Sequence, residues 1–454
     1  MRGGNFKAGF ARVDITPPLG TPLVGYFEER RAKGVLDGLE ANAVAFSDGN
    51  RTAVLIAADL LGIEGVSFGL ALRKRIASSV GVDAAAVYVH CTHTHTGPGA
   101  GRADKGRTNV FDGTDFYNEL LSSRLADVAR LAVDDLAPAT LAAGHAEAKR
   151  ISFLRRYRMK DGSIRTNPGV GNPDIAGPIG CLDETVRVLR IKRPGKSDVA
   201  IVNFATHPDV VGGEAISGDW PAMVRRTFER AEPGTRCVFF NGAQGDVNHV
   251  CIDPRPGECE GLHPDFDGVA RGYEHAVHMG RVVAAAALSA WGRCAPVEGG
   301  PISFGIGMVN VPSQMPDVRS LPGARRLVRL HRAGRDDEIP FRDMELTTAV
   351  AEAERMLLLE HGPKSLRLPV SMVAIGRDIA FVGIPGEPFS DIGRAIREAS
   401  PFATTICTCL TNASCGYFPV SSAYAEGGYE ARSSIFSSSV ADRLVKGAVA
   451  LLGG

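Results

Sequence analysis

The chain has 454 residues, of which 44% are hydrophobic and 22% are charged, as is ordinary for a soluble globular protein. Lys plus Arg and Asp plus Glu both number 51, so the charge balance points to neither a nucleic acid nor an anionic membrane surface as a partner. No stretch has the roughly 18 apolar residues of a membrane helix, and the N-terminus lacks the apolar core of a secretory signal. The nine cysteines lack CxxC spacing and fit a reducing compartment. We therefore expect a cytoplasmic protein that acts on a small molecule, alone or as a homo-oligomer.

The order of the predicted elements indicates a mixed α/β protein. A first strand at 9–16 leads through a Gly-rich loop to three β-hairpins, and amphipathic patterns predict helices between them. The hairpin strands are 41–46 with 52–58, 186–191 with 199–204, and 370–375 with 379–384; helices are predicted at about 66–80, 116–136, 275–291, 345–361 and 389–399, and a further strand at 235–240. We find no tandem repeat and no clean linker. We expect a single catalytic domain over 1–454, with hairpin-rich sheets packed together and flanked by helices in αββα-like layers.

Two histidines lie in the run AVYVHCTHTHTGPGAG at 86–101. A buried-strand pattern ends at Thr92 and opens into a loop that carries His93 and His95. In an extended segment, side chains two residues apart point the same way, so both imidazoles can face one cavity. Neutral imidazole is the commonest metal ligand. By itself the pair is consistent either with a metal site or with hydrogen-bonding loop histidines.

Two of the predicted hairpins are followed by residues that can also bind a metal ion. His207 follows the strand at 199–204, and Glu387 follows the strand at 379–384. In layered α/β proteins, functional sites gather beyond strand ends, so these side chains can converge with His93 and His95. The alternative, that His207 and Glu387 are surface turn residues, is not excluded by spacing alone.

Taken together, the motifs resemble the catalytic domain of the neutral/alkaline ceramidase family. They are DIT at 14–16, CTHTHTGPG at 91–99, NFATHP at 203–208, QGDVN at 244–248 and IPGEPF at 384–389, followed by a tyrosine-rich tail that reaches Tyr429. The resemblance implies one catalytic zinc ion bound by His93, His207, Glu387 and Tyr417. Tyr429 follows Tyr417 by twelve residues, as the second late tyrosine does in the family. The C-terminal immunoglobulin-like domain of full-length ceramidases is not expected here.

The resemblance also assigns residues to the reacting group. His95 faces the substrate instead of the metal, and an arginine in the middle of the domain contacts the reacting group. We prefer Arg155 to Arg156 for that arginine, and expect Asp246 to orient its neighbours as a carboxylate. Zinc activates water for attack on a carbonyl, and His95, Tyr429 and Arg155 are suitable partners for the oxyanion. His95 is our candidate for protonating the leaving group.

The chain departs from the family where ceramidases carry a serine after GDV. Here that position is Asn248, followed by His249. An amide is no nucleophile, so we expect direct attack by zinc-activated water, with Asn248, His249 and Arg156 binding the substrate. A small soluble linear amide is expected, and ceramide itself is not. Three alternatives stay open: an esterase or lactonase using the same site, a zinc-dependent lyase or isomerase acting on a sugar-like molecule, and a homologue that binds a ligand without catalysis.

Overall fold

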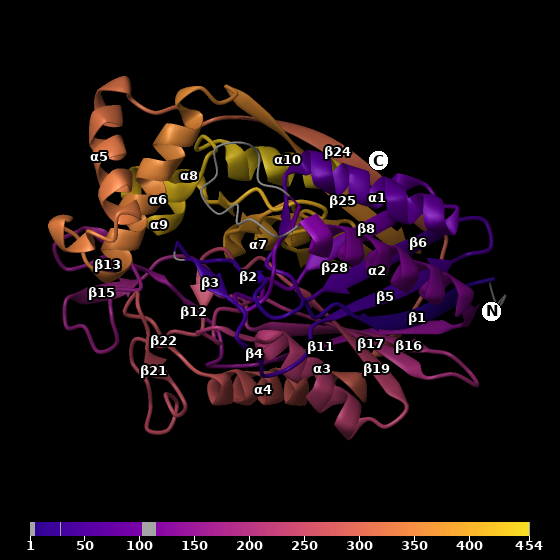
Figure 1. The fold of residues 1–454 in the computed structure, drawn as a ribbon. Coiled ribbons are helices and arrows are strands. Elements are labelled where there is room, and N and C mark those ends of the chain that lie inside the picture. Colours follow the sequence, from indigo (N-terminus) through magenta and orange to yellow (C-terminus); the bar gives the residue numbers. More distant parts are fainter. Residues whose placement is uncertain (1–4, 28, 102–114, 454) are drawn as a thin grey trace.

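The computed structural model describes residues 5–27, 29–101 and 115–453. Three β-sheets lie in its interior and carry helices on their outer faces (Figure 1). The expected mixed α/β fold with packed, hairpin-rich sheets and flanking helices is confirmed. Among the described residues, no helix is long and apolar enough to cross a membrane.

The first sheet has the strand order β10-β1-β5-β6-β8 and is covered by α1 and α2. Its elements are β10 (Ala137–Pro138), β1 (Lys7–Asp14), β5 (Glu40–Ser47), β6 (Thr52–Ala58), β8 (Val87–Cys91), α1 (Val66–Val80) and α2 (Asp115–Asp134). The predicted first hairpin and the helix at 66–80 are confirmed. Every residue of β8 is buried, as expected from its mostly apolar sequence Val-Tyr-Val-His-Cys.

The second sheet has the order β19-β17-β16-β11-β23 and packs its outer face on α3 and α4. Its elements are β19 (Thr235–Asn241), β17 (Asp198–Phe204), β16 (Thr185–Lys192), β11 (Thr140–Glu147), β23 (Ala295–Val297), α3 (Asp219–Ala231) and α4 (Tyr273–Trp291). The third sheet has the order β24-β25-β26-β28, with α7 and α10 outside it. These elements are β24 (Ile302–Pro312), β25 (Ser365–Ile375), β26 (Ile379–Gly383), β28 (Thr404–Thr408), α7 (Ser390–Glu398) and α10 (Val440–Leu452).

Each of the three sheets contains the same unit, although the sequence shows no repeat. Three strands pair antiparallel in succession, and the chain then crosses through a helix to a fourth strand that pairs parallel with the third. The units are β1-β5-β6-α1-β8, β11-β16-β17-α3-β19 and β24-β25-β26-α7-β28. Since the third and fourth strands are parallel, each unit presents two carboxyl strand ends at one edge of its sheet.

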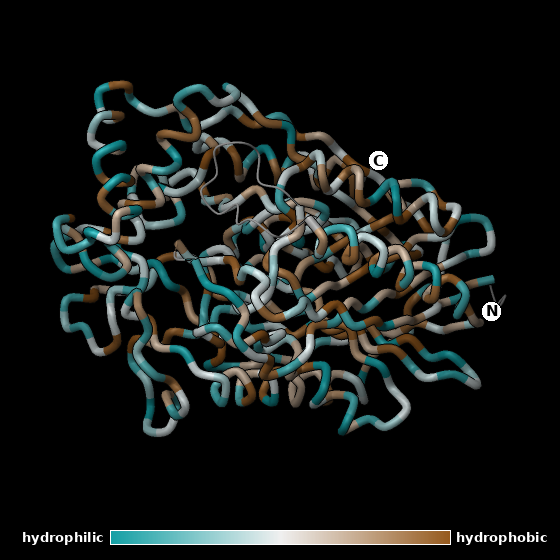
Figure 2. The backbone as a smooth tube through the Cα atoms, viewed as in Figure 1, coloured by the Kyte–Doolittle hydropathy of each residue, from teal (hydrophilic) through white to brown (hydrophobic). Residues whose placement is uncertain are grey.

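The inner faces of the three sheets share one hydrophobic core. Phe46 and Leu55 of the first sheet, Phe240 of the second and Phe381 of the third are fully buried in one cluster. Apolar residues accordingly concentrate in the interior strands in Figure 2, whereas polar residues mark the outer turns. Burial of both faces of each sheet supplies the main stabilising free energy and fixes the sheets relative to one another.

Hydrogen bonds join the fourth strands where the three sheets meet. The backbone N–H of Asn241, at the end of β19, donates to His90 Nε2 in β8 at 2.9 Å. The hydroxyls of Tyr88 in β8 and Thr408 in β28 are 2.5 Å apart. The loops that follow these strands therefore start from adjoining positions.

Candidate metal centre

Three strand ends supply the candidate ligands. His93 and His95 follow β8, His207 follows β17, and Glu387 opens the short strand β27 (Glu387–Pro388) just beyond β26. The four side chains are 1–6% exposed. His93 has a φ of 76°, a left-handed conformation that non-glycine residues seldom adopt. The expected convergence of the strand ends is therefore present.

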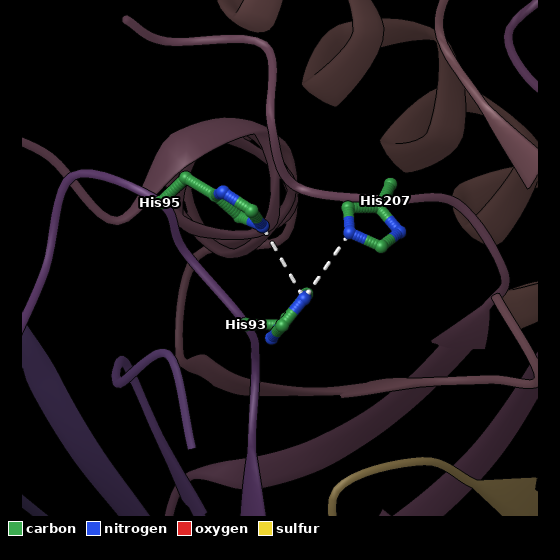
Figure 3. A group of neighbouring side chains, drawn as sticks. All are labelled: His93, His95 and His207. Atoms are coloured by element: carbon green, nitrogen blue, oxygen red, sulfur yellow. Dashed lines mark hydrogen bonds between the residues drawn. The ribbon is translucent and has the colours of Figure 1, made fainter. Parts of the chain in front are cut away.

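The three imidazoles point toward one another (Figure 3). His93 Nε2 lies 3.2 Å from His207 Nε2 and 3.3 Å from His95 Nε2. Glu387 Oε2 lies 3.3 Å from His93 Nε2 and 3.5 Å from His207 Nε2. Four potential ligand atoms thus surround a small common volume.

Backbone carbonyls determine which nitrogens of two rings are free. His93 Nδ1 donates to Leu61 O at 2.7 Å, and His207 Nδ1 lies 3.4 Å from Gln244 O. Since a carbonyl only accepts, each neutral ring carries its proton on Nδ1 and presents a lone pair at Nε2. Histidine ligands of metals characteristically donate their other N–H in this way.

The donor set fits zinc. Metal–ligand bonds of about 2.0–2.1 Å in a tetrahedral arrangement place ligand atoms about 3.3–3.4 Å apart. The distances among His93 Nε2, His207 Nε2 and Glu387 Oε2 are 3.2, 3.3 and 3.5 Å. Two lone pairs and a carboxylate oxygen at these separations repel one another unless a proton or a metal ion lies between them. His93, His95 and His207 also form a buried group able to hold a metal ion, so His95 is within reach of the same centre.

The surroundings of His207 favour its neutral form, whereas those of His93 favour protonation. Burial and the adjacent Arg155 lower the pKa of His207 well below its usual value. Burial also lowers the pKa of His93, but the Glu387 carboxylate outweighs it and the net shift is upward. A proton and a metal ion therefore compete for His93 Nε2, as is usual at metal sites.

Tyr417 and Tyr429 lie at the more open side of the cluster, where both are partly exposed. Tyr417 begins β29 (Tyr417–Phe418) and is the register partner of Glu387 in β27. Its ring stacks toward His207 with the centroids 6.4 Å apart and meets Tyr429 edge-on at 5.5 Å. Tyr417 therefore adjoins His207 and Glu387, and Tyr429 adjoins Tyr417; the roles predicted for the two tyrosines stay predictions.

Arg155, the preferred arginine, lies beside both tyrosines. Its guanidinium carbon is 5.3 Å from the ring centroid of Tyr417 and 6.0 Å from that of Tyr429. Its Nε donates to Glu430 Oε1 at 2.6 Å and its Nη2 to Gly245 O at 2.7 Å. Arg156, by contrast, donates to Glu426 and to Gly427 O, at 3.0 and 3.2 Å, and packs over Phe389. Arg156 therefore stabilises the turn at Glu426 and Gly427.

The remaining predicted residues form the surrounding framework. Asp246 accepts from Ser390 N at 2.7 Å and Ser390 Oγ at 3.0 Å, at the N-terminus of α7, and so fixes the chain after Glu387. Asn248 donates to Asn167 Oδ1 at 3.0 Å and accepts from Val250 N. His249 Nε2 lies 2.8 Å from Ala270 O. Asn248 and His249 thus contact neighbouring loops. The substrate-binding role predicted for these two residues and for Arg156 stays a prediction, as does the orienting role predicted for Asp246.

A cavity of about 580 Å³ adjoins this framework and has Tyr429, Thr166 and Asn167 in its wall. Thr166 Oγ1 accepts from Tyr429 N and donates to Glu430, and Asn167 holds Asn248. Another part of its wall comes from α6 (Asp343–Glu360) and the residues before it, with charged and apolar side chains including Arg342, Asp343, Glu345, Phe341 and Met344. The lining of the cavity therefore contains both polar and apolar side chains.

Sequence reasoning missed three residues beside His95. Asp209 Oδ1 lies 3.8 Å from His95 Nδ1, the Tyr26 and His95 rings are 5.1 Å apart, and Arg271 binds Asp209. The position of Asp209, two residues after His207, was the available signal. No local pattern marked Tyr26 or Arg271, which reach the site from distant loops.

Solved ceramidase structures share this architecture. The chain superposes on the crystal structure of neutral ceramidase from Pseudomonas aeruginosa with a TM-score of 0.73 and 19% sequence identity, covering 99% of this chain and 75% of that one. A ceramidase complexed with C2 matches with a TM-score of 0.72, 18% identity and the same coverage. No protein-family model and no curated protein sequence matches the chain. The fold is thus that of neutral ceramidase, as the motifs predict, in a chain of strongly diverged sequence.

Proposed function

We propose that this protein is a zinc-dependent hydrolase that cleaves the C–N bond of a small, soluble, linear amide. The observation that carries the proposal is the cluster of His93 Nε2, His207 Nε2 and Glu387 Oε2, at mutual distances of 3.2–3.5 Å, in a ceramidase-like fold. His93, His207 and Glu387 hold the ion, with Tyr417 as the fourth protein ligand. Two imidazoles and a carboxylate are a common catalytic zinc set.

The residues around the cluster supply the other requirements of amide hydrolysis. Bound zinc supplies Lewis-acid chemistry that activates water and polarises an acyl carbonyl. His95 moves the proton from the attacking water to the leaving nitrogen, since its Nε2 faces the cluster. The Tyr429 hydroxyl and the cationic Arg155 stabilise the charge that develops on the acyl oxygen. No serine is needed at position 248.

The cavity beside Tyr429 supports a small substrate. Arg342, Asp343 and Glu345 contribute charged groups to its wall, and burying such groups against long alkyl chains is costly. The apolar contacts offered by Phe341 and Met344 suit a short acyl or amine group. We therefore propose a compact polar amide, and not ceramide, as the substrate.

Metal analysis tests the first part of the proposal. Purified protein is expected to hold about one zinc ion per chain, and His93→Ala or His207→Ala to lose most of it. His361→Ala is the matched control, because the His361 side chain is 89% exposed and lies outside the cluster. Zinc content that is unchanged in both cluster variants would overturn the metal assignment.

A panel of N-acyl amides, esters, lactones and a short-chain ceramide tests the reaction. The proposal expects amine release from a small amide that stops on chelation and returns with zinc. Turnover of esters or lactones alone would identify an esterase, and zinc binding without product release from any member would favour a lyase, an isomerase or a ligand-binding protein.

A further inference from the structure

One nitrogen of His95 is buried without a hydrogen-bond partner. The residue is 6% exposed, and its Nε2 faces His93, whereas its Nδ1 makes no hydrogen bond. The loop at Gly25 closes over this nitrogen so tightly that a Cβ at Gly25 would lie 2.6 Å from Nδ1. A buried polar nitrogen without a hydrogen-bond partner is costly, so a partner for Nδ1 is to be expected nearby.

Asp209 provides the facing acceptor. Its Oδ1 lies 3.8 Å from His95 Nδ1, and both side chains are largely buried. A shift of about 1 Å brings the pair to the usual N–H···O distance of about 2.9 Å. Catalytic hydrogen bonds are often long before a substrate or metal is bound and then shorten.

The Asp209 carboxylate is held in place by groups from two other segments of the chain: Tyr26, and Arg271 in the short strand β22 (Ala270–Arg271). Arg271 donates to it through Nε and Nη2, both at 2.9 Å, and the Tyr26 hydroxyl donates to Oδ1. Arg271 also donates to Asp267 at 2.7 and 2.8 Å and packs against the Tyr26 ring at 4.8 Å. A bidentate arginine pair of this kind keeps the carboxylate charged and fixes its plane.

The same assembly fixes His95 from its backbone side. Arg30 Nη2 donates to His95 O at 2.7 Å, and its guanidinium carbon lies 4.0 Å from the centre of the Tyr26 ring. Asp267, the second partner of Arg271, lines the cavity beside Tyr429. Asp267 in the cavity wall is therefore linked to His95 through Arg271 and Asp209.

We propose that Asp209 is the positioning residue for His95: it accepts the Nδ1 proton in a hydrogen bond and thereby keeps the Nε2 lone pair directed at the reacting group. The catalytic meaning of this bond rests on the function proposed above. In that reaction Nε2 takes a proton from the attacking water and gives it to the leaving nitrogen, while the Nδ1 proton stays in place. The pair corresponds chemically to the carboxylate and imidazole of other general acid–base pairs.

Nitrogen-15 NMR of the histidine rings tests the bond without any turnover. With zinc-loaded protein, and with His95 assigned by His95→Gln, we expect Nδ1 to be protonated in the wild type and the tautomer to shift in Asp209→Asn. Asp265→Asn is the matched control, because Asp265 also pairs with Arg271, at 3.2 Å, but has no contact with His95. An unprotonated Nδ1 in the wild type, or an unchanged ring in Asp209→Asn, would overturn the proposal.

Kinetics on an amide substrate provide the second readout. Asp209→Asn is expected to lower kcat about 10- to 100-fold with KM and zinc content nearly unchanged, as for other groups that orient a catalytic imidazole. In a His95→Ala background the same substitution should have no further effect, whereas a merely structural role would slow both proteins equally. If no amide is turned over, the function proposal fails while the NMR result still decides the role of Asp209.

A third variant covers the case in which Asp209→Asn does not fold. Tyr26→Phe removes the hydroxyl that competes for Oδ1 and leaves the carboxylate in place. The Nδ1–H bond should then strengthen, moving the Nδ1 proton signal of His95 downfield. An unmoved signal would contradict the proposal.

Discussion

Glu387 and Tyr417 are register partners in the parallel pair of β27 and β29, thirty residues apart in sequence and side by side at the cluster. Because side chains alternate between the two faces along each strand, register partners on neighbouring strands project to the same face. The segments that follow β26 and β28 thus place two oxygen-bearing side chains, those of Glu387 and Tyr417, beside the imidazoles that come from the first and second units.

The pair leads to a prediction on metal affinity. Glu387→Gln is expected to weaken zinc binding by more than about tenfold, because a neutral amide oxygen is a poorer ligand than a carboxylate. Tyr417→Phe is expected to weaken it less, since three ligands remain. Competition with a chromophoric chelator measures both, with Glu398→Gln as control because Glu398 is 65% exposed.

Unchanged zinc affinity in Glu387→Gln would point to a different set of ligands. If Glu387→Gln binds zinc as tightly as the wild type and His95→Ala does not, the ion is held by the three histidines His93, His95 and His207, which form a buried group of suitable size. The Glu387 assignment would then be wrong.

Because Gly25 lies against His95, we expect Gly25→Ala to lower both the stability and the activity of the protein. Gly25 has a φ of 116°, and an added Cβ would meet His95 Nδ1 at 2.6 Å and Leu61 Cδ1 at 3.0 Å. Gly25→Ala should therefore cost about 1–3 kcal/mol of unfolding free energy and reduce kcat by displacing His95. Gly20→Ala, at a φ of 86° with open space around it, carries the backbone strain alone and should leave kcat unchanged. Equal loss of kcat in both variants would contradict the prediction.

Asp246 predicts a pH dependence of stability. Burial raises the pKa of Asp246 to about 6, above its usual value, although Ser390 donates to it. Because the folded protein binds this proton more tightly than the unfolded chain, the contribution is fully present below about pH 4 and is lost as the pH rises through about 6. The shift of about two pKa units corresponds to a loss on the order of 3 kcal/mol.

Urea unfolding between pH 4 and pH 7 measures the contribution of Asp246 to the unfolding free energy. Asp246→Asn keeps an acceptor for Ser390 but cannot ionise, so its unfolding free energy should fall less with rising pH than that of the wild type. The difference between the two proteins removes the contribution of the metal ligands, which both share. The exposed Asp174 provides the control substitution Asp174→Asn, whose pH profile should follow the wild type. Parallel profiles for Asp246→Asn and the wild type would contradict the prediction.

Local elements were the most predictable part of the molecule. The helix predicted at 66–80 is α1 (Val66–Val80), and the three predicted hairpins are present with strand ends shifted by a few residues. These elements follow from periodicity and turn residues that lie close together in the chain. The threefold repetition escaped prediction because Val, Ile, Leu, Ala and Phe substitute for one another in buried strands, so equivalent units need not share a motif.

From the sequence alone we could predict histidines and a glutamate after buried strands, in motifs that resemble those of ceramidases. Which of these side chains meet depends on the tertiary structure. The distances between His93, His207 and Glu387 depend on the packing of three sheets around one core, and that packing is set by contacts more than a hundred residues apart in the chain. For the same reason Asp209, Tyr26 and Arg271 became visible only as neighbours of His95, since no local pattern records which distant loop closes over a strand end.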